Sequence, residues 1–279
     1  MSGLVTRPIL RYHGGKYRIA PWILSFFPQH RCYVEPYGGA ASVLLRKPRS
    51  YSEVYNDLDG EIVNLFRMAR DRGEDLARAA ELTPFSRDEF LSSWDTCDDD
   101  LERARRILIR GWMGFGSSAT TRDRGTKSFR STRERTSPTG FRDNCTRAST
   151  TPASDWRNFP EALREIIERL RGVVIENRPA IQVMQKHDGP ETLHYVDPPY
   201  VSATRDQGRD YRHEMTEANH IELAACLNSL QGAVILSGYD CQLYRQLYTG
   251  WHRREKDSLG DGATKRREVL WMRNTGLML

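Results

Sequence analysis

The stretch Asp197-Pro198-Pro199-Tyr200 brings an acid and an aromatic side chain into one short segment. It follows the apolar run 193–196, which predicts a buried strand. The two prolines disfavour helix and end that strand sharply. Because open α/β sheets bind their ligands at the carboxyl ends of the strands, we expect Asp197 and Tyr200 to face a ligand.

A glycine pair precedes the first expected helix. Gly14 and Gly15 permit a tight turn with close approach of a ligand to the backbone, and Lys16 supplies a cation at that turn. A plain surface turn explains the same residues equally well, so this motif is weak alone. The apolar spacing over 19–26 then predicts a short helix that ends before Pro28.

A strand, a turn of small residues and a helix are expected over 31–45. Glu35 ends the strand, the turn over 36–42 includes Gly39, and Val43 begins the helix. Such a unit can present backbone N–H groups to a ligand. Ala41 stands where the dinucleotide fingerprint has its second glycine, and no Gly-Lys-Ser/Thr sequence follows. Dinucleotide and nucleoside triphosphate sites are therefore disfavoured.

Asp57 falls at the end of the next expected strand, 51–57, about 20 residues after the glycine turn. An acid at this place can accept hydrogen bonds from ribose hydroxyl groups. The alternative is that Asp57 caps the helix expected over 60–70. Asp59 is the better candidate for that cap, so we assign Asp57 to ribose binding.

The later part of the chain alternates strands and helices. Helices are expected over 160–171, 180–186 and 217–230, and strands over 173–175, 193–197, 233–239 and 267–272. Ile221, Ala224 and Leu227 are predicted to face the core, and His220 is interpreted as a surface or packing residue. This alternation predicts an α/β fold with a doubly wound, mostly parallel sheet.

Residues 71–155 differ from these sheet-forming parts. Helical patterns over 74–81, 87–94 and 101–112 lead into a polar, Ser/Thr-rich segment. Nine basic and four acidic residues lie between Ser117 and Arg157, so this segment holds the entire net charge of +5. Such a concentration indicates a phosphate-binding element, although a disordered basic loop has the same composition. We expect an inserted domain over 71–155 and a sheet domain formed by 1–70 and 156–279.

Composition disfavours several other classes of protein. No apolar run approaches the roughly 20 residues that span a bilayer, and no secretory signal is visible at the N-terminus. We therefore expect a cytoplasmic protein without membrane contacts. The five cysteines form no CxxC pair, which argues against a zinc site or a disulfide framework.

In their order along the chain, these motifs resemble those of Dam-like DNA adenine N6-methyltransferases of the phage-associated D12 class. The matching motifs are Gly14-Gly15-Lys16, Glu35-Pro36-Tyr37-Gly38-Gly39, Asn56-Asp57, Asp197-Pro198-Pro199-Tyr200, Ser237-Gly238-Tyr239 and Glu268-Val269-Leu270-Trp271. Donor-site motifs come first, a target-recognition insert follows, and the catalytic tetrapeptide comes after it. The resemblance implies a Rossmann-like methyltransferase sheet with 71–155 as the DNA target-recognition domain.

The resemblance also implies S-adenosylmethionine as the methyl donor, with no metal. By position in the motifs, the donor-contacting residues are Tyr12, Lys16, Glu35, Gly39, Asp57 and Asp197. The sequence departs from the family at Ala41, where glycine is frequent. It also lacks the usual acid and aromatic pair over 176–179, so no residue is assigned to the donor's adenine ring.

Catalytic roles for Asp197, Pro198 and Tyr200 follow from the chemistry of the adenine amino group, whose lone pair is delocalised into the ring. Hydrogen bonds from N6–H to the Asp197 carboxylate and the Pro198 carbonyl would localise that lone pair and stabilise developing positive charge. The nitrogen could then attack the sulfonium methyl group in line. The base must leave the duplex to react, and Tyr200 is the expected stacking partner of the flipped adenine.

Double-stranded DNA is the expected partner, and the candidate DNA contacts are Arg122, Arg124, Lys127 and Arg130. We expect a monomer in a bacterial or phage-infected cell, and the resemblance allows a cognate restriction endonuclease. Two alternatives stay open: a cytosine-N4 methyltransferase, and a DNA-binding protein that keeps the fold without turnover. The family alone suggests GATC as the recognition sequence.

Overall fold

The computed structural model describes residues 5–116, 120, 140–143, 150–201, 204, 211–259 and 265–276. The chain divides into two compact units. The sheet unit comprises 16–59 and 172–279, and the helical unit comprises 1–15 and 60–171.

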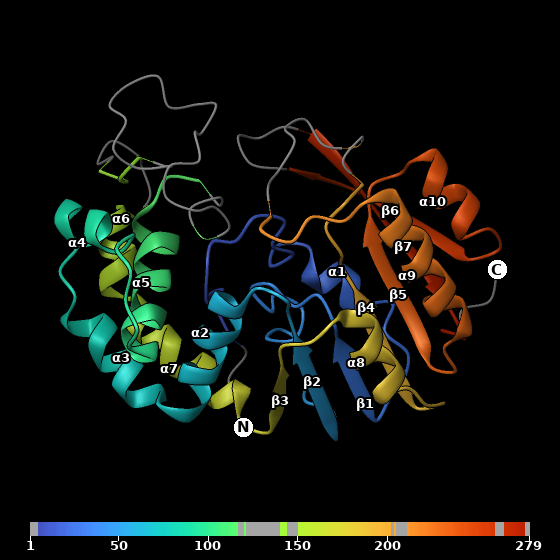
Figure 1. The fold of residues 1–279 in the computed structure, drawn as a ribbon, viewed down its shortest axis with the longest axis horizontal. Helices are drawn as coiled ribbons and strands as arrows, with labels where there is room; N and C mark the ends of the chain where they lie inside the picture. Colours follow the sequence, from blue (N-terminus) through green and yellow to red (C-terminus); the bar gives the residue numbers. More distant parts are fainter. Residues whose placement is uncertain are drawn as a thin grey trace. The chain divides into compact units, whose positions relative to one another are not determined.

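Seven strands form the sheet of the described residues: β1 (Cys32–Glu35), β2 (Ser52–Asn56), β3 (Val173–Glu176), β4 (Thr192–Val196), β5 (Ala233–Gly238), β6 (His252–Leu259) and β7 (Lys265–Arg273). Their order in the sheet is β3-β2-β1-β4-β5-β7-β6 (Figure 1). The pairs among β1 to β5 are parallel, whereas β7 pairs antiparallel with β5 and β6. The predicted mostly parallel, Rossmann-like α/β sheet is confirmed.

One face of this sheet packs against three helices, α8 (Ala180–Lys186), α9 (Glu217–Ser229) and α10 (Gln242–Leu247). Leu227 and Tyr244 from these helices join Leu236 and Trp271 from the strands in one buried cluster. The opposite face carries Tyr33 and Tyr195, whose rings contact Phe27 just after α1 (Ala20–Leu24). Both faces are therefore buried, as the near-continuous apolar strands require.

The described part of the helical unit contains α2 (Gly60–Asp71), α3 (Gly73–Leu82), α4 (Arg87–Ser92), α5 (Asp100–Met113), α6 (Pro152–Arg157) and α7 (Phe159–Leu170). α5 packs against α2, α3, α4 and α6, and α7 packs against α3. The rings of Trp112 and Phe159 lie 4.6 Å apart, and Trp112 Nε1 donates to the carbonyl of Ile9 at 3.0 Å.

This compact unit includes more of the sequence than the expected insert over 71–155. α2, α7 and the N-terminal segment bury their apolar side chains against α3 and α5, so they belong to the helical unit by packing. The assignment of 71–155 to DNA target recognition is a functional one and stays a prediction.

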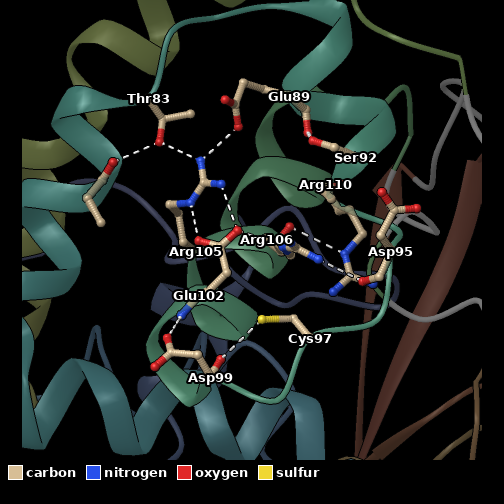
Figure 2. Close-up of polar contacts among 12 residues, drawn as sticks. Thr83, Glu89, Ser92, Asp95, Cys97, Asp99, Glu102, Arg105, Arg106 and Arg110 are labelled. Carbon is tan, nitrogen blue, oxygen red and sulfur yellow. Dashed lines mark hydrogen bonds and ion pairs between the residues drawn. The ribbon is translucent and has the colours of Figure 1, made fainter.

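A network of charged side chains joins α4 to α5 (Figure 2). Arg105 donates to Glu102 at 2.6 Å, to Glu89 at 2.8 Å and to the Thr83 hydroxyl at 2.9 Å. Arg106 donates to the same Glu102 carboxylate at 2.6 Å. Because these partly buried groups share partners, we expect the network to hold α4 against α5 better than isolated surface pairs, which contribute about 0–1 kcal/mol each.

The prediction that a helix begins at Val43 is wrong. Residues 42–46 form turns, in which the N–H of Lys47 donates to the carbonyl of Val43 at 3.0 Å. Pro48 follows at once, and it can neither donate to a further helical turn nor let Lys47 adopt helical backbone angles easily.

The predicted inward face of α9 is wrong at one position. Ile221 is 49% exposed, whereas His220 is buried and lies 3.1 Å from the hydroxyl of Tyr244. The buried positions His220, Leu223, Ala224 and Leu227 follow helical spacing, which leaves Ile221 on the other face. Of the two interpretations of His220, packing is the correct one.

Candidate active site

Three sequence-predicted acids lie at the carboxyl edge of the sheet. Glu35 is the last residue of β1, Asp57 directly follows β2, and Asp197 directly follows β4. β1 pairs in parallel with both β2 and β4, so these three strands end at the same edge. Parallel pairing thus gathers carboxylates that are far apart in the sequence at the edge where such sheets bind ligands.

Lys16 and Asp197 form a buried ion pair. Nζ of Lys16 lies 2.9 Å from Oδ2 of Asp197, and the lysine side chain is 7% exposed. Burial alone would lower the pKa of Lys16, but the carboxylates of Asp197 and Glu268 outweigh it and raise that pKa above its usual value. The lysine is therefore a fixed cation within the site.

The second oxygen of Asp197 is a buried hydrogen-bond acceptor. Oδ1 is buried and has no hydrogen-bond partner among the residues that the structure describes. A buried acceptor without a donor costs free energy, so most such atoms in proteins are paired. An N–H group of a bound molecule would satisfy Oδ1 while Lys16 retains Oδ2.

Tyr200 is held at its ring and at its hydroxyl group. Nζ of Lys16 lies 4.8 Å from the ring centroid, and the ring of Tyr239 meets it edge-on at 4.5 Å. The hydroxyl donates to Oε1 of Glu268 and lies 3.3 Å from Oγ of Ser237. Because the hydroxyl points into the protein, β5 and β7 set the orientation of this ring.

Asp57 supports the glycine turn. Its Oδ2 accepts from the N–H of Gly39 at 2.8 Å, and its Oδ1 accepts from the N–H of Asp59 at 2.8 Å. Burial raises the pKa of Asp57 to about 6, although both hydrogen bonds oppose this shift. A carboxylate has about four lone-pair positions, so Asp57 can also accept from hydroxyl groups. Its contact with ribose stays a prediction.

Glu35 is an internal support of the same turn. It is 2% exposed and accepts from the hydroxyl of Tyr33 at 2.6 Å and from the N–H of Leu44 at 2.9 Å. Burial raises the pKa of Glu35 to about 8 against the effect of these hydrogen bonds. A direct contact between Glu35 and the donor stays a prediction.

Close packing explains the small residues of the glycine turn. A Cβ atom on Gly38 would lie 2.1 Å from the ring of Tyr55, whose hydroxyl donates to the carbonyl of Gly39 at 2.7 Å. Gly39 has φ 48° and Ala41 has φ 51°. Ala41 therefore adopts, at some cost, the left-handed conformation that glycine takes freely.

At this edge, no sequence pattern indicated Arg212, and Asn56 was named only as part of the motif Asn56-Asp57. Nη1 of Arg212 donates to both carboxylate oxygens of Asp59 at 2.9 Å, which ties Arg212 to the loop that follows β2. Asn56 is buried, and its Nδ2 donates to the carbonyls of Pro36 at 2.8 Å and Arg178 at 3.0 Å. The position of Asn56 beside Asp57 could have indicated its role, whereas Arg212 has no comparable signal.

Tyr12 belongs to the helical unit, where its carbonyl accepts from the N–H of Gly15 at 3.1 Å. The four candidate DNA contacts lie outside the described residues, and their role stays a prediction: Arg122, Arg124, Lys127 and Arg130.

The described residues lack the features of metal sites and membrane spans. They contain no group of three or more His, Cys, Asp or Glu side chains that could hold a metal ion. None of the described helices is both long enough and apolar enough to cross a membrane. The absence of a metal requirement stays a prediction.

The sequence over residues 12–259 matches the family of D12 class N6 adenine-specific DNA methyltransferases. The chain belongs to this family. The predicted family and the predicted adenine-specific DNA methyltransferase activity are thereby confirmed, whereas a link to phage stays a prediction.

Curated relatives agree with this family. The DNA adenine methylase of Salmonella typhi is 25% identical over 261 residues, which cover 87% of this chain and 84% of the relative. The DNA adenine methylase of Escherichia coli K12 is 24% identical over 265 residues, covering 90% and 85%. The Type II methyltransferase M1.LlaDCHI of Lactococcus lactis subsp. cremoris is 24% identical over 267 residues, covering 87% and 84%.

Proposed function

We propose that this D12-class chain transfers a methyl group from S-adenosylmethionine to N6 of an adenine that is flipped out of double-stranded DNA. The observation that carries the proposal is the Asp197 carboxylate. Lys16 holds one of its oxygens at 2.9 Å, and the other is buried without a partner among the described residues. An exocyclic amino group offers the N–H donor that this second oxygen lacks.

The carboxyl edge of the sheet fits the chemical groups of S-adenosylmethionine. Asp57 has acceptor capacity for the ribose hydroxyls, and Lys16 is a cation for the donor's carboxylate. The carboxylate of Asp197 provides negative charge for a cationic molecule. When bound, the donor supplies an electrophilic methyl group on a positively charged sulfur atom. Tyr12, Glu35 and Gly39 complete the proposed donor-contacting residues.

Asp197 and Pro198 activate the target nitrogen in this proposal. Hydrogen bonds from the adenine amino group to the Asp197 carboxylate and the Pro198 carbonyl localise the nitrogen lone pair. The same carboxylate stabilises the positive charge that develops at nitrogen during transfer. Lys16 orients the Asp197 side chain through Oδ2. Asp197 need not remove a proton first, because the methylated amine is acidic enough to lose it afterwards.

Tyr200 is the proposed stacking partner of the flipped base. One ammonium group, that of Lys16, contacts both the Tyr200 ring and the Asp197 carboxylate. Ring and carboxylate are therefore close enough for a single base to reach both. Stacking on an aromatic ring contributes roughly 1–3 kcal/mol per base and offsets part of the cost of leaving the duplex.

Residues 71–155 are the proposed target-recognition part. The support is the concentration of positive charge between Ser117 and Arg157, which suits the phosphates of duplex DNA. Arg122, Arg124, Lys127 and Arg130 are the proposed contacts. The Lactococcus relative is named a type II methyltransferase, which supports a cognate restriction endonuclease as a further partner. We propose that the chain acts in the cytoplasm, where its DNA substrate lies, and that it does so as a monomer.

Transfer of labelled methyl groups to duplex DNA tests the proposed function. We expect the label in N6-methyladenine, and label found only in cytosine, RNA or protein would contradict it. Asp197→Ala should abolish transfer and retain DNA binding, whereas Asp240→Ala, which alters another acid of the sheet unit, should retain transfer. Methylation-sensitive sequencing of DNA from expressing cells would identify the recognition sequence.

A further inference from the structure

The carboxylate of Glu268 lies in the same buried cluster as Lys16 and Tyr200, although it comes from the last strand. Glu268 lies on β7 and is 4% exposed. Since β7 runs antiparallel to β5, it enters the sheet at the edge where β5 ends, and Val269 is paired with Gly238. A residue near the start of β7 is thereby carried to the carboxyl edge of the parallel strands.

Three donor groups converge on one oxygen of Glu268. Oε1 accepts from Oγ of Ser237 at 2.6 Å and from the hydroxyl of Tyr200, and Nζ of Lys16 lies 3.9 Å away. A buried carboxylate is tolerated when it is paired and hydrogen-bonded, and these contacts meet that requirement. They also give the Tyr200 hydroxyl a partner that fixes the tilt of its ring.

We propose that Glu268 is a positioning residue for methyl transfer, which acts by holding the ring of Tyr200 in the orientation that receives the flipped base. This inference rests on the proposed function of Tyr200. Glu268 is bonded to the hydroxyl at the far end of the ring and is therefore expected to act without touching either substrate. The family match and the names of the relatives assign no role to this residue.

The simplest alternative is that Glu268 only stabilises the pairing of β5 with β7. Substitution would then reduce the amount of folded enzyme but would leave the chemistry of each folded molecule unchanged. A single-turnover rate per donor-binding site separates these cases, because it counts only folded molecules.

Four variants test the positioning role in a wild-type chain that has been shown to methylate adenine. Glu268→Leu removes the acceptor, and Glu268→Gln keeps an acceptor oxygen for Tyr200 and Ser237. Tyr200→Phe removes the same hydrogen bond from its other end. Glu255→Leu, on the neighbouring strand β6, is the matched control, since its partners are the partly exposed Arg253 and Arg267.

The expected rates follow from the loss of one hydrogen bond to a charged group. Glu268→Leu and Tyr200→Phe should each lower the single-turnover rate about 10- to 100-fold. The double variant should be no more than about threefold slower than either single variant, because both substitutions remove the same hydrogen bond between Tyr200 and Glu268. Glu268→Gln should restore the rate to within about fivefold of wild type, and Glu255→Leu should stay within about twofold.

Independent, multiplicative losses in the double variant would overturn the inference, as would a wild-type rate for Glu268→Leu. If Glu268→Leu does not fold, the double variant Tyr200→Phe/Glu268→Gln replaces it in the test. The inference then requires that its single-turnover rate is no lower than that of Tyr200→Phe alone. A wild-type chain that transfers no methyl group to adenine would refute the proposed function itself. An active wild-type chain with an undisturbed Glu268→Leu variant would refute only the role of Glu268.

Discussion

Nζ of Lys16 lies 2.9 Å from Oδ2 of Asp197 and 4.8 Å from the centre of the Tyr200 ring. Lys16, which follows the glycine pair Gly14-Gly15, thus contacts both Asp197 and Tyr200. This relationship orients the carboxylate, since Lys16 contacts one oxygen while the other is the proposed acceptor for the amino group. The predictions below test this arrangement and the parts of the chain that maintain it.

Asp197→Asn should lower the methyl-transfer rate about 10²- to 10³-fold, the range seen when an electrostatic stabiliser of a transition state is removed. The asparagine keeps the volume but loses the negative charge that pairs with Lys16 and that we propose to stabilise the reacting nitrogen. Single-turnover kinetics measure the rate, and fluorescence anisotropy should show DNA binding within a few-fold of wild type. A rate within tenfold of wild type would exclude the proposed role of the carboxylate.

Donor binding should depend on pH through Asp57. Burial raises the pKa of Asp57 to about 6, so its carboxylate becomes protonated as the pH falls from 7.5 to 5. The ionised form is the better acceptor for ribose hydroxyls, and we expect the affinity for the donor to weaken several-fold over this range. Calorimetric titration measures this change. Asp57→Asn should bind the donor weakly and with a flatter pH dependence; identical profiles would contradict the ribose assignment.

The free energy of unfolding should fall between pH 6.5 and 8 because of Glu35. Its pKa is raised to about 8 in the fold, whereas an unfolded glutamate titrates near pH 4.3. The native chain therefore retains a proton that the unfolded chain has released, and stability is lost as pH rises through this window. The slope is at most about 1.4 kcal/mol per pH unit. Denaturant unfolding should show a smaller slope for Glu35→Gln; equal slopes would rule out this contribution.

Gly38→Ala should destabilise the sheet unit by about 1–3 kcal/mol, since overpacking costs this much. The added Cβ would lie 2.1 Å from the ring of Tyr55 and displace the turn that carries Gly39. Thermal unfolding measures the stability, and a donor titration should show weaker binding as well. Gly189→Ala is the control, because the nearest atom to its Cβ is 3.9 Å away. Equal effects of the two substitutions would contradict the packing argument.

Substituting Gln for Arg122, Arg124, Lys127 and Arg130 should flatten the dependence of DNA affinity on salt. The slope of log K against log salt should shrink by about 0.9 for each phosphate contact removed. Anisotropy titrations at several salt concentrations measure this slope. The control replaces four exposed arginines of the helical unit: Arg70, Arg72, Arg78 and Arg164. An unchanged slope in the first set would show that these four residues make no phosphate contacts.

The sequence predicted the parts of the fold that have strong local signals. The sequence located β1, β2, β4 and β5, and the acids that end or follow the first three of these strands were found by position. Parallel pairing then brings these acids together, so the sheet edge could be predicted without knowing any distance. The helix expected at Val43 does not form, because Pro48 follows the apolar residues closely and ends the turns.

The features that the sequence did not predict depend on tertiary contacts. β6 carries charged residues along its length and lacks apolar periodicity, so only its pairing with β7 and its ion pairs define it as a strand. The sequence places Glu268 in a family motif but gives no partner for it, because its contact with Tyr200 depends on the antiparallel direction of β7. Such contacts between distant residues cannot be inferred from local spacing.

The direction of β7 also sets when this site can form. Tyr200 cannot find its hydrogen-bond partner until residue 268 has been made, and contacts of such sequence separation form slowly because a long loop must close first. On the ribosome, strands β1 to β5 can begin to associate while the tyrosine ring is still unanchored. We therefore expect a newly synthesised chain to acquire its collapsed core before it acquires catalytic competence.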